Sequence, residues 1–351
     1  MTTATDPTNP RPLLVANDLR KHFPIKGKLF AKKSVVQAVD DVSFEVHQGE
    51  TLGIVGESGC GKSTTARLLL HLIPPDSGEV VFDGKAVGKP EGIAPSALYR
   101  QMQMVFQDSY ASLNPRLSIA QSIAFGPVVQ GVPRREALDR AISLLERVGL
   151  APNLYANRYP HELSGGQRQR VNISRALAFE PKLLVLDEAV SALDKSVEAQ
   201  VLNLLGEIKA AFDLTYVFIS HDLSVVRYVS DRVMVMYLGK VVEIGPVDAI
   251  YEQPRHPYTK ALLAAMPSMS PRRRTEQAPL TGDPPNPIDP PSGCRFRTRC
   301  PLAAPVCAEK APRLVTQAGK DHRHLAACHL YDPAAAHPRA QEVCHAQPVP
   351  V

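Results

Sequence analysis

The sequence has no hydrophobic segment long enough to cross a membrane. A spanning helix needs about 18 or more consecutive apolar residues, and no run of that length occurs. The opening segment, MTTATDPTNPRP, is polar and rich in proline, so we expect neither a signal peptide nor a membrane anchor there. If the function involves a membrane, other chains must supply the part that spans it.

Neither the charge balance nor the cysteine content defines a class of function by itself. The 40 basic and 35 acidic residues are intermixed and leave a formal net charge of +5. Such a balance permits nucleic-acid binding without indicating it, and it would equally suit a surface that faces anionic lipids. The six cysteines, with Cys60 far from the others, are expected to be reduced cytosolic thiols, which favours metal binding over disulfides for the clustered ones.

Length and hydrophobic patterning indicate one large domain with an appendage. The 351 residues are 44% hydrophobic, enough to bury a full core, and contain no internal repeat. Alternation of apolar and polar residues predicts strands in LLVANDL, VVQAVDDVSFEV and TLGIV, which we interpret as an antiparallel sheet that leads into the strand ending at Gly56. SGEVVFDGKAV is typical of a further hairpin.

Helical patterns and buried strands follow in the middle of the chain. TTARLLLHLI predicts a helix that ends at Pro74 and Pro75, and REALDRAISLLERVGL predicts one that ends at Gly149. KLLVLDE and TYVFISHD are short apolar runs of the kind found in parallel strands buried on both faces. Strands that alternate with helices indicate an α/β core. Beyond residue 253, 17 of the 32 prolines are concentrated, which predicts a loop-rich extension.

Residues 56–63, GESGCGKS, match the phosphate-binding pattern G-x-x-x-x-G-K-[ST]. A strand before it and a helix after it make a plain glycine turn the weaker interpretation. Glycines let consecutive backbone N–H groups point at phosphate oxygens, while Lys62 reaches the outer phosphates and Ser63 ligates Mg²⁺. The residues expected to hold a nucleoside triphosphate here are Gly56, Glu57, Ser58, Gly59, Cys60, Gly61, Lys62, Ser63 and Thr64.

The strand LLVL ends in two acidic residues. Asp187 is placed to reach the Mg²⁺, and Glu188 follows it to polarise an attacking water. Two acids after a strand are often no more than a polar strand end. Together with a phosphate-binding loop they predict the second half of a nucleotide hydrolysis site.

LSGGQ at 163–167 is the signature motif of ATP-binding-cassette (ABC) proteins, which this sequence resembles. The other family elements follow the same order: Gln107 in MVFQD, SALD at 191–194 and His221 in FISHD. The resemblance implies that Gln107 contacts Mg²⁺ and the water, and that His221 contacts the γ-phosphate. It also implies ATP contacts from further residues, namely Ser164, Gly165, Gly166, Gln167, Asp187 and Asp194.

The resemblance implies Glu188, His221 and Gln107 as catalytic residues, and Ser63, Gln107 and Asp187 as the Mg²⁺ ligands. Phe23, before the phosphate-binding loop, is the candidate to stack on adenine, with an ordinary core phenylalanine as the alternative. Lys195 departs from the family pattern, since an apolar residue usually follows SALD.

The implied fold is an α/β, P-loop (RecA-like) ABC cassette with an antiparallel β subdomain, a helical signature subdomain and a small extension rich in cysteine and proline. We expect a disordered N-terminus over 1–12, the ATP-binding domain over 13–255, the extension over 256–332 and a disordered tail over 333–351. In the family, two cassettes face each other, so each ATP lies between the P-loop of one and the LSGGQ of the other.

Three strings, SYASLNPR, HPYTKALL and PPSGCRFRTRCP, resemble the ATP-binding subunits of prokaryotic oligopeptide, dipeptide and nickel importers. The resemblance implies ATP hydrolysis that powers peptide uptake through two separate transmembrane permease subunits, with segment 107–130 as the contact. It further implies a second cassette, identical or paralogous, an extracytoplasmic solute-binding protein, a peripheral position on the cytoplasmic side of the inner membrane and no nucleic-acid partner.

Other functions stay open at this point. Nickel or another small solute would use the same machinery. A soluble ABC ATPase that acts on DNA or ribosomes is disfavoured, because the chain has neither a long coiled-coil insertion nor a second cassette. An exporter cassette is often fused to its membrane span or lacks such an extension.

Four cysteines of the extension could together hold a metal, which in a loop-rich segment can replace a hydrophobic core. Some relatives hold a [4Fe-4S] cluster at this place, and we expect the same here. Structural zinc with help from His322, His324 or His329, and unligated thiols, are the alternatives. The expected ligands are Cys294, Cys300, Cys307 and Cys328.

Overall fold

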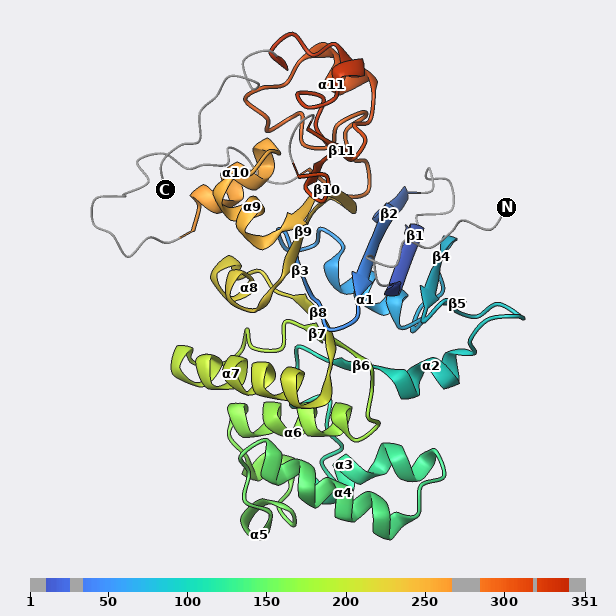
Figure 1. The fold of residues 1–351 in the computed structure, drawn as a ribbon, viewed down its shortest axis with the longest axis vertical. Helices are drawn as coiled ribbons and strands as arrows, with labels where there is room; N and C mark the ends of the chain where they lie inside the picture. Colours follow the sequence, from blue (N-terminus) through green and yellow to red (C-terminus); the bar gives the residue numbers. More distant parts are fainter. Residues whose placement is uncertain (1–10, 26–33, 267–284, 318–320, 341–351) are drawn as a thin grey trace.

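The computed structural model describes residues 11–25, 34–266, 285–317 and 321–340. Two β-sheets and the helices that pack on them form this part of the chain (Figure 1). Within it, no helix combines the length and the apolar character that a membrane crossing requires. The N-terminus expected to be disordered lies outside the described residues up to position 10, and Pro12 already begins the first strand.

The larger sheet carries the nucleotide-site motifs. From edge to edge it contains β11 (Val315–Thr316), β12 (Leu325–Ala326), β10 (Lys240–Pro246), β9 (Arg232–Tyr237), β3 (Thr51–Val55), β8 (Thr215–Ile219), β7 (Leu183–Asp187) and β6 (Met102–Val105). The strands from β9 to β6 are parallel, whereas β10, β12 and β11 add to the β9 edge as antiparallel strands.

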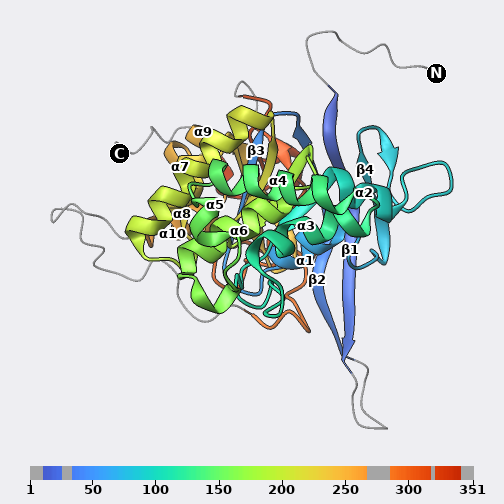
Figure 2. The ribbon, with the colours of Figure 1, turned by 90° about the horizontal axis from the view of Figure 1, so that it is seen from below.

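The smaller sheet is antiparallel throughout. Its strands lie in the order β2 (Ser34–His47), β1 (Pro12–Ile25), β4 (Ser77–Phe82) and β5 (Lys85–Ala86). The predicted hairpin in SGEVVFDGKAV is confirmed as β4 and β5. Figure 2 shows β1 and β2 as a long two-stranded ribbon.

The helices form two sets around the larger sheet. Helices α3, α4, α5 and α6 lie at one end of the molecule, while α9, α10 and α11 lie near the opposite end (Figure 1). The helices are α1 (Lys62–Leu69), α2 (Pro95–Gln101), α3 (Ile119–Val129), α4 (Arg134–Arg147), α5 (Pro152–Tyr155), α6 (Gly165–Leu177), α7 (Lys195–Phe212), α8 (Leu223–Val229), α9 (Val247–Glu252), α10 (Pro257–Ala264) and α11 (Pro305–Glu309), with 3₁₀ turns at Pro160–Glu162 and Pro333–Ala335.

Both faces of the parallel strands are buried, as their apolar runs predict. In β7, Leu184 and Leu186 pack into the core shared with α3, α4, α6 and α7. Leu183 and Val185 point the other way, into the core shared with α1 and the smaller sheet. Because side chains of a strand alternate between faces, a strand between two cores needs an unbroken apolar sequence.

Three features differ from the sequence prediction. Strand β3 pairs in parallel with β8 and β9 and so belongs to the larger sheet, not to the antiparallel one. Helix α1 ends at Leu69, before the prolines, since His71 takes a left-handed φ of 54° and the next amide, Leu72 N–H, bonds back to Arg67 O. The disordered tail was placed too early, because Pro333–Ala335 form a 3₁₀ turn and His337 is buried against Leu302; the tail beyond residue 340 lies outside the described residues.

The extension is continuous with the larger sheet. Strand β12 pairs with β10, and the Ala327 amide donates to the carbonyl oxygen of Val242. Glu243 of β10 is fully buried and accepts hydrogen bonds from the backbone amides of Arg255 and His256, and it lies 2.7 Å from His324 Nε2. A buried carboxylate with three partners fixes the start of the extension to the sheet.

Candidate active site

The phosphate-binding loop joins β3 to α1, as predicted. All five residues of β3 are buried, and α1 begins at Lys62 directly after the loop. Gly61 has a φ of 110°, and a Cβ at this position would lie 2.2 Å from the carbonyl oxygen of Ala38 on β2. Only glycine fits such a close approach in this backbone conformation. Strand β2 of the smaller sheet therefore packs directly against the loop.

Lys62 lies inside the loop. Its side chain is buried, and its Nζ donates to the carbonyl oxygens of Gly56, at 2.8 Å, and Glu57, at 3.1 Å. Ser58 and Gly59 are exposed at the tip of the loop, Cys60 is buried beneath it, and Thr64 is half-buried in the first turn of α1. The loop thus holds an ammonium group next to the N-terminus of α1, an arrangement that suits an anion.

Ser63 and Asp187 meet where α1 and β7 converge. Ser63 Oγ donates to Asp187 Oδ1 at 3.0 Å. Burial raises the pKa of Asp187, the Ser63 hydrogen bond lowers it, and the nearby Glu188 charge raises it, with a net increase. Two hard oxygen donors beside a phosphate-binding loop are a ligand pair that Mg²⁺ prefers. The pair fits the predicted Mg²⁺ site, since a bound cation would favour the charged form of Asp187.

Glu188 lies between the other two predicted catalytic residues. Gln107 Nε2 donates to its Oε2 at 2.8 Å, and His221 Nδ1 lies 3.4 Å from its Oε1. The three side chains come from the ends of β6, β7 and β8, neighbouring strands of the sheet. Glu188 has a left-handed φ of 49°, a conformation uncommon outside glycine that often marks functional sites.

The residues that follow Glu188 fold back onto it. The backbone amide and hydroxyl of Ser191 both donate to the Glu188 carbonyl oxygen, at 3.2 and 3.0 Å. Asp194 is exposed at the start of α7, and the adjacent Lys195 binds Asp222 Oδ2 at 2.8 Å. Because Asp222 directly follows His221, this lysine joins the SALD segment to the histidine loop.

The signature motif forms the N-terminus of α6. Ser164 Oγ accepts from the Gln167 amide, and Gln167 Oε1 accepts from the Ser164 amide, a reciprocal cap. A Cβ on Gly166 would lie 2.4 Å from Val197 Cγ1 of α7, so glycine permits the two helices to pack there. Helix α6 packs against α3, α4 and α7, whereas α1 packs against β2 and β7. The N-termini of α1 and α6 thus belong to different parts of the structure.

Phe23 lies on β1 with 39% of its surface exposed. It pairs with Val36 on β2, two residues before the Ala38 that supports Gly61. Lys21 Nζ lies 5.8 Å from the centroid of the Phe23 ring. An exposed ring on the strand pair that backs the phosphate-binding loop is compatible with stacking on a base and disfavours the core alternative.

The four cysteines of the extension converge on one small cavity. Cys294, Cys300, Cys307 and Cys328 line it, together with His329 and others, and its volume is about 10 Å³. That is about the room for one water. Burial raises the pKa of Cys294 to about 11 and of Cys328 to about 12, so both thiols are protonated near neutral pH.

The metal predictions for the extension are not supported by this arrangement. Among the described residues, no group of three or more His, Cys, Asp or Glu side chains is placed to hold a metal ion. The histidines considered for zinc have other roles, because His324 contacts Glu243 and His329 Nε2 contacts the Lys310 carbonyl oxygen, while His322 is exposed. The described residues therefore support neither the [4Fe-4S] cluster nor zinc.

Two residues of the site were missed at the sequence level. Arg299 pairs with Glu57 of the phosphate-binding loop, and the Glu57 amide donates to Tyr258 Oη at 2.9 Å. Both residues lie in the strings HPYTKALL and PPSGCRFRTRCP. Those strings indicated a subfamily, but nothing in their local pattern points to a loop some 200 residues away.

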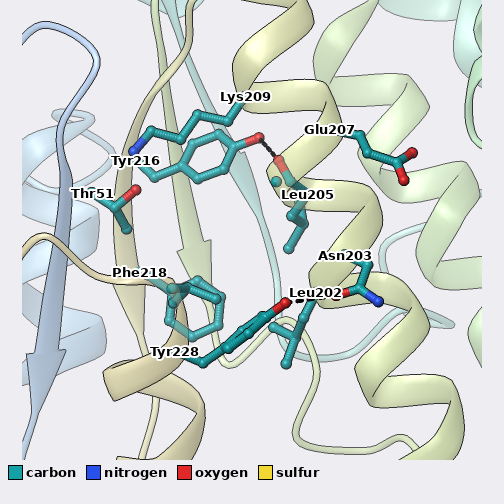
Figure 3. Close-up of a pocket in the computed structure, with 11 residues that line it drawn as sticks. Thr51, Leu202, Asn203, Leu205, Glu207, Lys209, Tyr216, Phe218 and Tyr228 are labelled. Atoms are coloured by element: carbon teal, nitrogen blue, oxygen red, sulfur yellow. Dashed lines mark hydrogen bonds between the residues drawn. The ribbon is translucent and has the colours of Figure 1, made fainter.

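A larger hollow lies apart from the predicted residues. Figure 3 shows this pocket of about 510 Å³, bordered by β8, α7 and α8. In its lining, Tyr216 Oη of β8 donates to the Leu205 carbonyl oxygen of α7 at 2.9 Å, and Tyr228 Oη of α8 donates to Asn203 Oδ1 of α7 at 2.8 Å. None of the residues predicted to bind ATP lines it.

Comparison with known protein families gives two matches. Residues 39–191 match the ABC transporter family, which includes the phosphate-binding loop and the signature motif. Residues 242–307 match the C-terminal region of oligopeptide/dipeptide transporters, which includes Tyr258, Arg299 and three of the four clustered cysteines.

Individual proteins agree with both matches. The chain is 51% identical over 327 residues to the "Probable peptide ABC transporter ATP-binding protein y4tS" of Sinorhizobium fredii, which covers 92% of this chain and 91% of that relative. It is 48% identical to the oligopeptide transport ATP-binding protein AppF of Bacillus subtilis, over 92% of this chain and 98% of the relative. It is also 48% identical to the dipeptide transport ATP-binding protein DppF of Haemophilus influenzae, over 86% and 93%.

Among solved structures, CbiO1 of Clostridium perfringens, part of the ABC transporter complex CbiONQ, resembles the chain with a TM-score of 0.59 and 28% identity. The similarity covers 69% of this chain and 91% of CbiO1. The sequence identity over nearly the full length, the family matches and the shared fold agree. The chain therefore belongs to the ABC transporter family of ATP-hydrolysing proteins, in the group that carries the oligopeptide/dipeptide transporter C-terminal region.

Proposed function

We propose that this ATPase powers the import of peptides through separate membrane permease subunits. The observation that carries the proposal is the match of residues 242–307 to the oligopeptide/dipeptide transporter C-terminal region. The names of the similar proteins, which include oligopeptide and dipeptide transport ATP-binding proteins, point the same way. In this role the chain lies on the cytoplasmic face of the membrane, and a solute-binding protein on the other side supplies the peptide.

For hydrolysis we assign Glu188 to the attacking water. The carboxylate takes the water proton as the oxygen attacks the γ-phosphorus, and the bond to the bridging oxygen breaks to give ADP and phosphate. Gln107 and His221 support this step, because both contact the Glu188 carboxylate. Lys62 binds the phosphates. Ser63, Asp187 and Gln107 would hold Mg²⁺, which neutralises charge on the phosphate oxygens when it is bound.

A second cassette completes the site in this proposal. Ser164, Gly165, Gly166 and Gln167 at the N-terminus of α6 cover the ATP of a facing cassette, and Asp194 is exposed at the start of α7 beside them. A helix N-terminus with a preformed cap favours a phosphate arriving from outside. The facing chain is a second copy or a paralogue. We assign Phe23 to the adenine ring in the same nucleotide.

An apolar groove next to Gln107 is our candidate for the permease contact. It has a volume of about 260 Å³, is lined by Tyr99, Phe106, Phe125 and Phe179 among others, and lies beside α3. Phe125 is 59% exposed, and Phe106, directly before Gln107, is 37% exposed. Exposed apolar side chains around a groove mark interaction sites. A partner seated there can act on Gln107 and so on Glu188.

The first experiment is a pull-down of tagged Glu188→Gln protein from detergent-solubilised native membranes with ATP present. Recovery of two polytopic permeases supports the proposal, and any second cassette is identified in the same sample. Recovery of ribosomal or DNA-bound proteins without permeases would overturn it in favour of a soluble ABC ATPase.

The groove is tested in the same assay by Phe125→Glu. A charge in the groove should abolish recovery of the permeases. Leu154→Glu is the matched control, since Leu154 is 56% exposed but lies on α5, outside the groove. Equal recovery with both variants would place the permease contact elsewhere.

A further inference from the structure

The C-terminal extension forms an ion pair with the phosphate-binding loop. Arg299 Nη1 lies 2.9 Å from Glu57 Oε2, and its Nη2 lies 3.1 Å from Glu57 Oε1. The side chains are 6% and 22% exposed. Two parallel contacts between a guanidinium and a carboxylate fix direction as well as distance. The carboxylate of the second residue of the loop is therefore held by a residue 242 positions later in the chain.

Tyr258 holds the backbone of the same residue. The Glu57 amide donates to its Oη at 2.9 Å, and the tyrosine is fully buried. Its ring packs against those of Tyr237 and Phe296, with centroids 4.6 and 5.4 Å away. Three packed aromatic rings leave the hydroxyl little freedom to move. Both the side chain and the amide of Glu57 are thus positioned from the extension and its junction with the sheet.

A second arginine of the extension supports the other side of the loop. Arg295 donates to the Leu238 carbonyl oxygen and lies 2.5 Å from Asp40 Oδ2. The next residue after Leu238, Gly239, donates its amide to the Cys60 carbonyl oxygen at 2.8 Å. Segment 295–299 therefore contacts the phosphate-binding loop directly through Glu57 and indirectly through Cys60.

The Glu57 charge has a consequence for phosphate binding. A carboxylate on the second residue of the loop would repel the several negative charges of a triphosphate, and in a partly buried setting this repulsion is weakly screened. Arg299 neutralises the carboxylate and fixes its position through the two parallel contacts. Burial lowers the pKa of Arg299, but its hydrogen bonds to Glu57 and Tyr237 raise the pKa by more than burial lowers it. The net pKa is raised, and the guanidinium stays charged.

We propose that Arg299 of the C-terminal extension is a positioning residue of the nucleotide site, which neutralises and orients Glu57 so that the loop can bind ATP. The extension then sets the affinity of the cassette for ATP. This inference rests on the assignment of residues 56–63 to the phosphates. It concerns no contact between Arg299 and the nucleotide itself.

The test compares ATP affinity of full-length variants in equilibrium binding with a fluorescent ATP analogue, with KM and kcat measured in parallel. We expect Arg299→Ala to weaken binding about tenfold, or about 1.4 kcal/mol, and to raise KM by the same factor while kcat changes less. Glu57→Gln in the Arg299→Ala background removes the unpaired charge and should restore the affinity to within about threefold of wild type.

The matched control is Arg297→Ala. Arg297 lies on the same segment, but its guanidinium binds Ser292 within the extension, so this variant should bind ATP like wild type. Wild-type affinity in Arg299→Ala, or failure of Glu57→Gln to restore it, would overturn the inference. A purely structural role would not be rescued by removal of the facing charge.

Two further measurements keep the result decisive. If thermal unfolding shows that Arg299→Ala does not fold, Arg299→Lys takes its place, because lysine keeps the charge but cannot make the two parallel contacts. This variant should weaken ATP binding about threefold, and wild-type affinity would overturn the inference. Lys62→Ala tests the underlying site assignment. If Lys62→Ala still binds ATP, the assignment is wrong; if it does not bind and Arg299→Ala does, only this inference fails.

Discussion

Replacement of Gly61 by alanine should damage the nucleotide site through backbone geometry alone. Its φ of 110° is strained for any residue with a Cβ, and the added atom would lie 2.2 Å from the Ala38 carbonyl oxygen. A left-handed or similar backbone conformation costs about 1–3 kcal/mol, and forcing apart a packed contact costs a further 1–3 kcal/mol or so. We therefore expect about 4 kcal/mol of lost unfolding free energy.

The control separates the two contributions. Gly84, in the turn between β4 and β5, has a φ of 74° but no atom within 4 Å of its would-be Cβ. Gly84→Ala should therefore lose only the backbone contribution, about 1–3 kcal/mol. Urea denaturation followed by circular dichroism gives both values, and ATP binding should be lost in Gly61→Ala only. Equal losses of unfolding free energy in the two variants would refute the close contact between Gly61 and β2.

Three further predictions follow from the contacts described above. Glu188→Gln should abolish ATP turnover while ATP binding persists; a wild-type rate in a phosphate-release assay would remove Glu188 from the mechanism. Glu243→Ala should lower the unfolding free energy by about 3 kcal/mol, because His324 and two backbone amides lose their buried acceptor; a loss under 1 kcal/mol or so would contradict that network. Burial raises the pKa of Cys294 to about 11 and of Cys328 to about 12, against an ordinary value of 9.0. The folded protein therefore favours the protonated thiols, and these two groups should stabilise it by a constant amount below pH 9. This stabilisation should be lost as the pH rises toward 11 to 12. Denaturation across this range and slow reaction with a thiol reagent at pH 7 check this, and about four iron and four sulfide ions per chain would instead restore the [4Fe-4S] prediction.

The parts of the site that the sequence predicted are those whose residues are neighbours in a motif. Lys62 and Ser63 follow directly from the glycine pattern, and Asp187 and Glu188 from an apolar strand that ends in two acids. Their meeting in space follows from parallel strands, whose carboxyl ends lie at one edge of a sheet. Gln107, Glu188 and His221 lie together in the structure because they follow β6, β7 and β8, which are neighbouring strands.

The sequence could not show partners that are distant along the chain. Strand β3 follows β2 closely and shares its alternation, yet it pairs with β8, more than 160 residues later. Arg299 and Glu57 carry no pattern that links them. The four cysteines of the extension were expected to meet as metal ligands, but the sequence does not show the size of the cavity between them, which depends on how the surrounding side chains pack.

Strand β12 covers the edge of β10 through pairs at Glu243 and Ile244. Without the extension, β10 would be the last strand of the larger sheet and would present unpaired backbone groups beside the apolar side chains of Val241 and Val242. Such an edge is a template for pairing with another chain. A protein shortened to the ATP-binding domain should therefore aggregate through strand addition. The extension thus helps to keep the protein soluble.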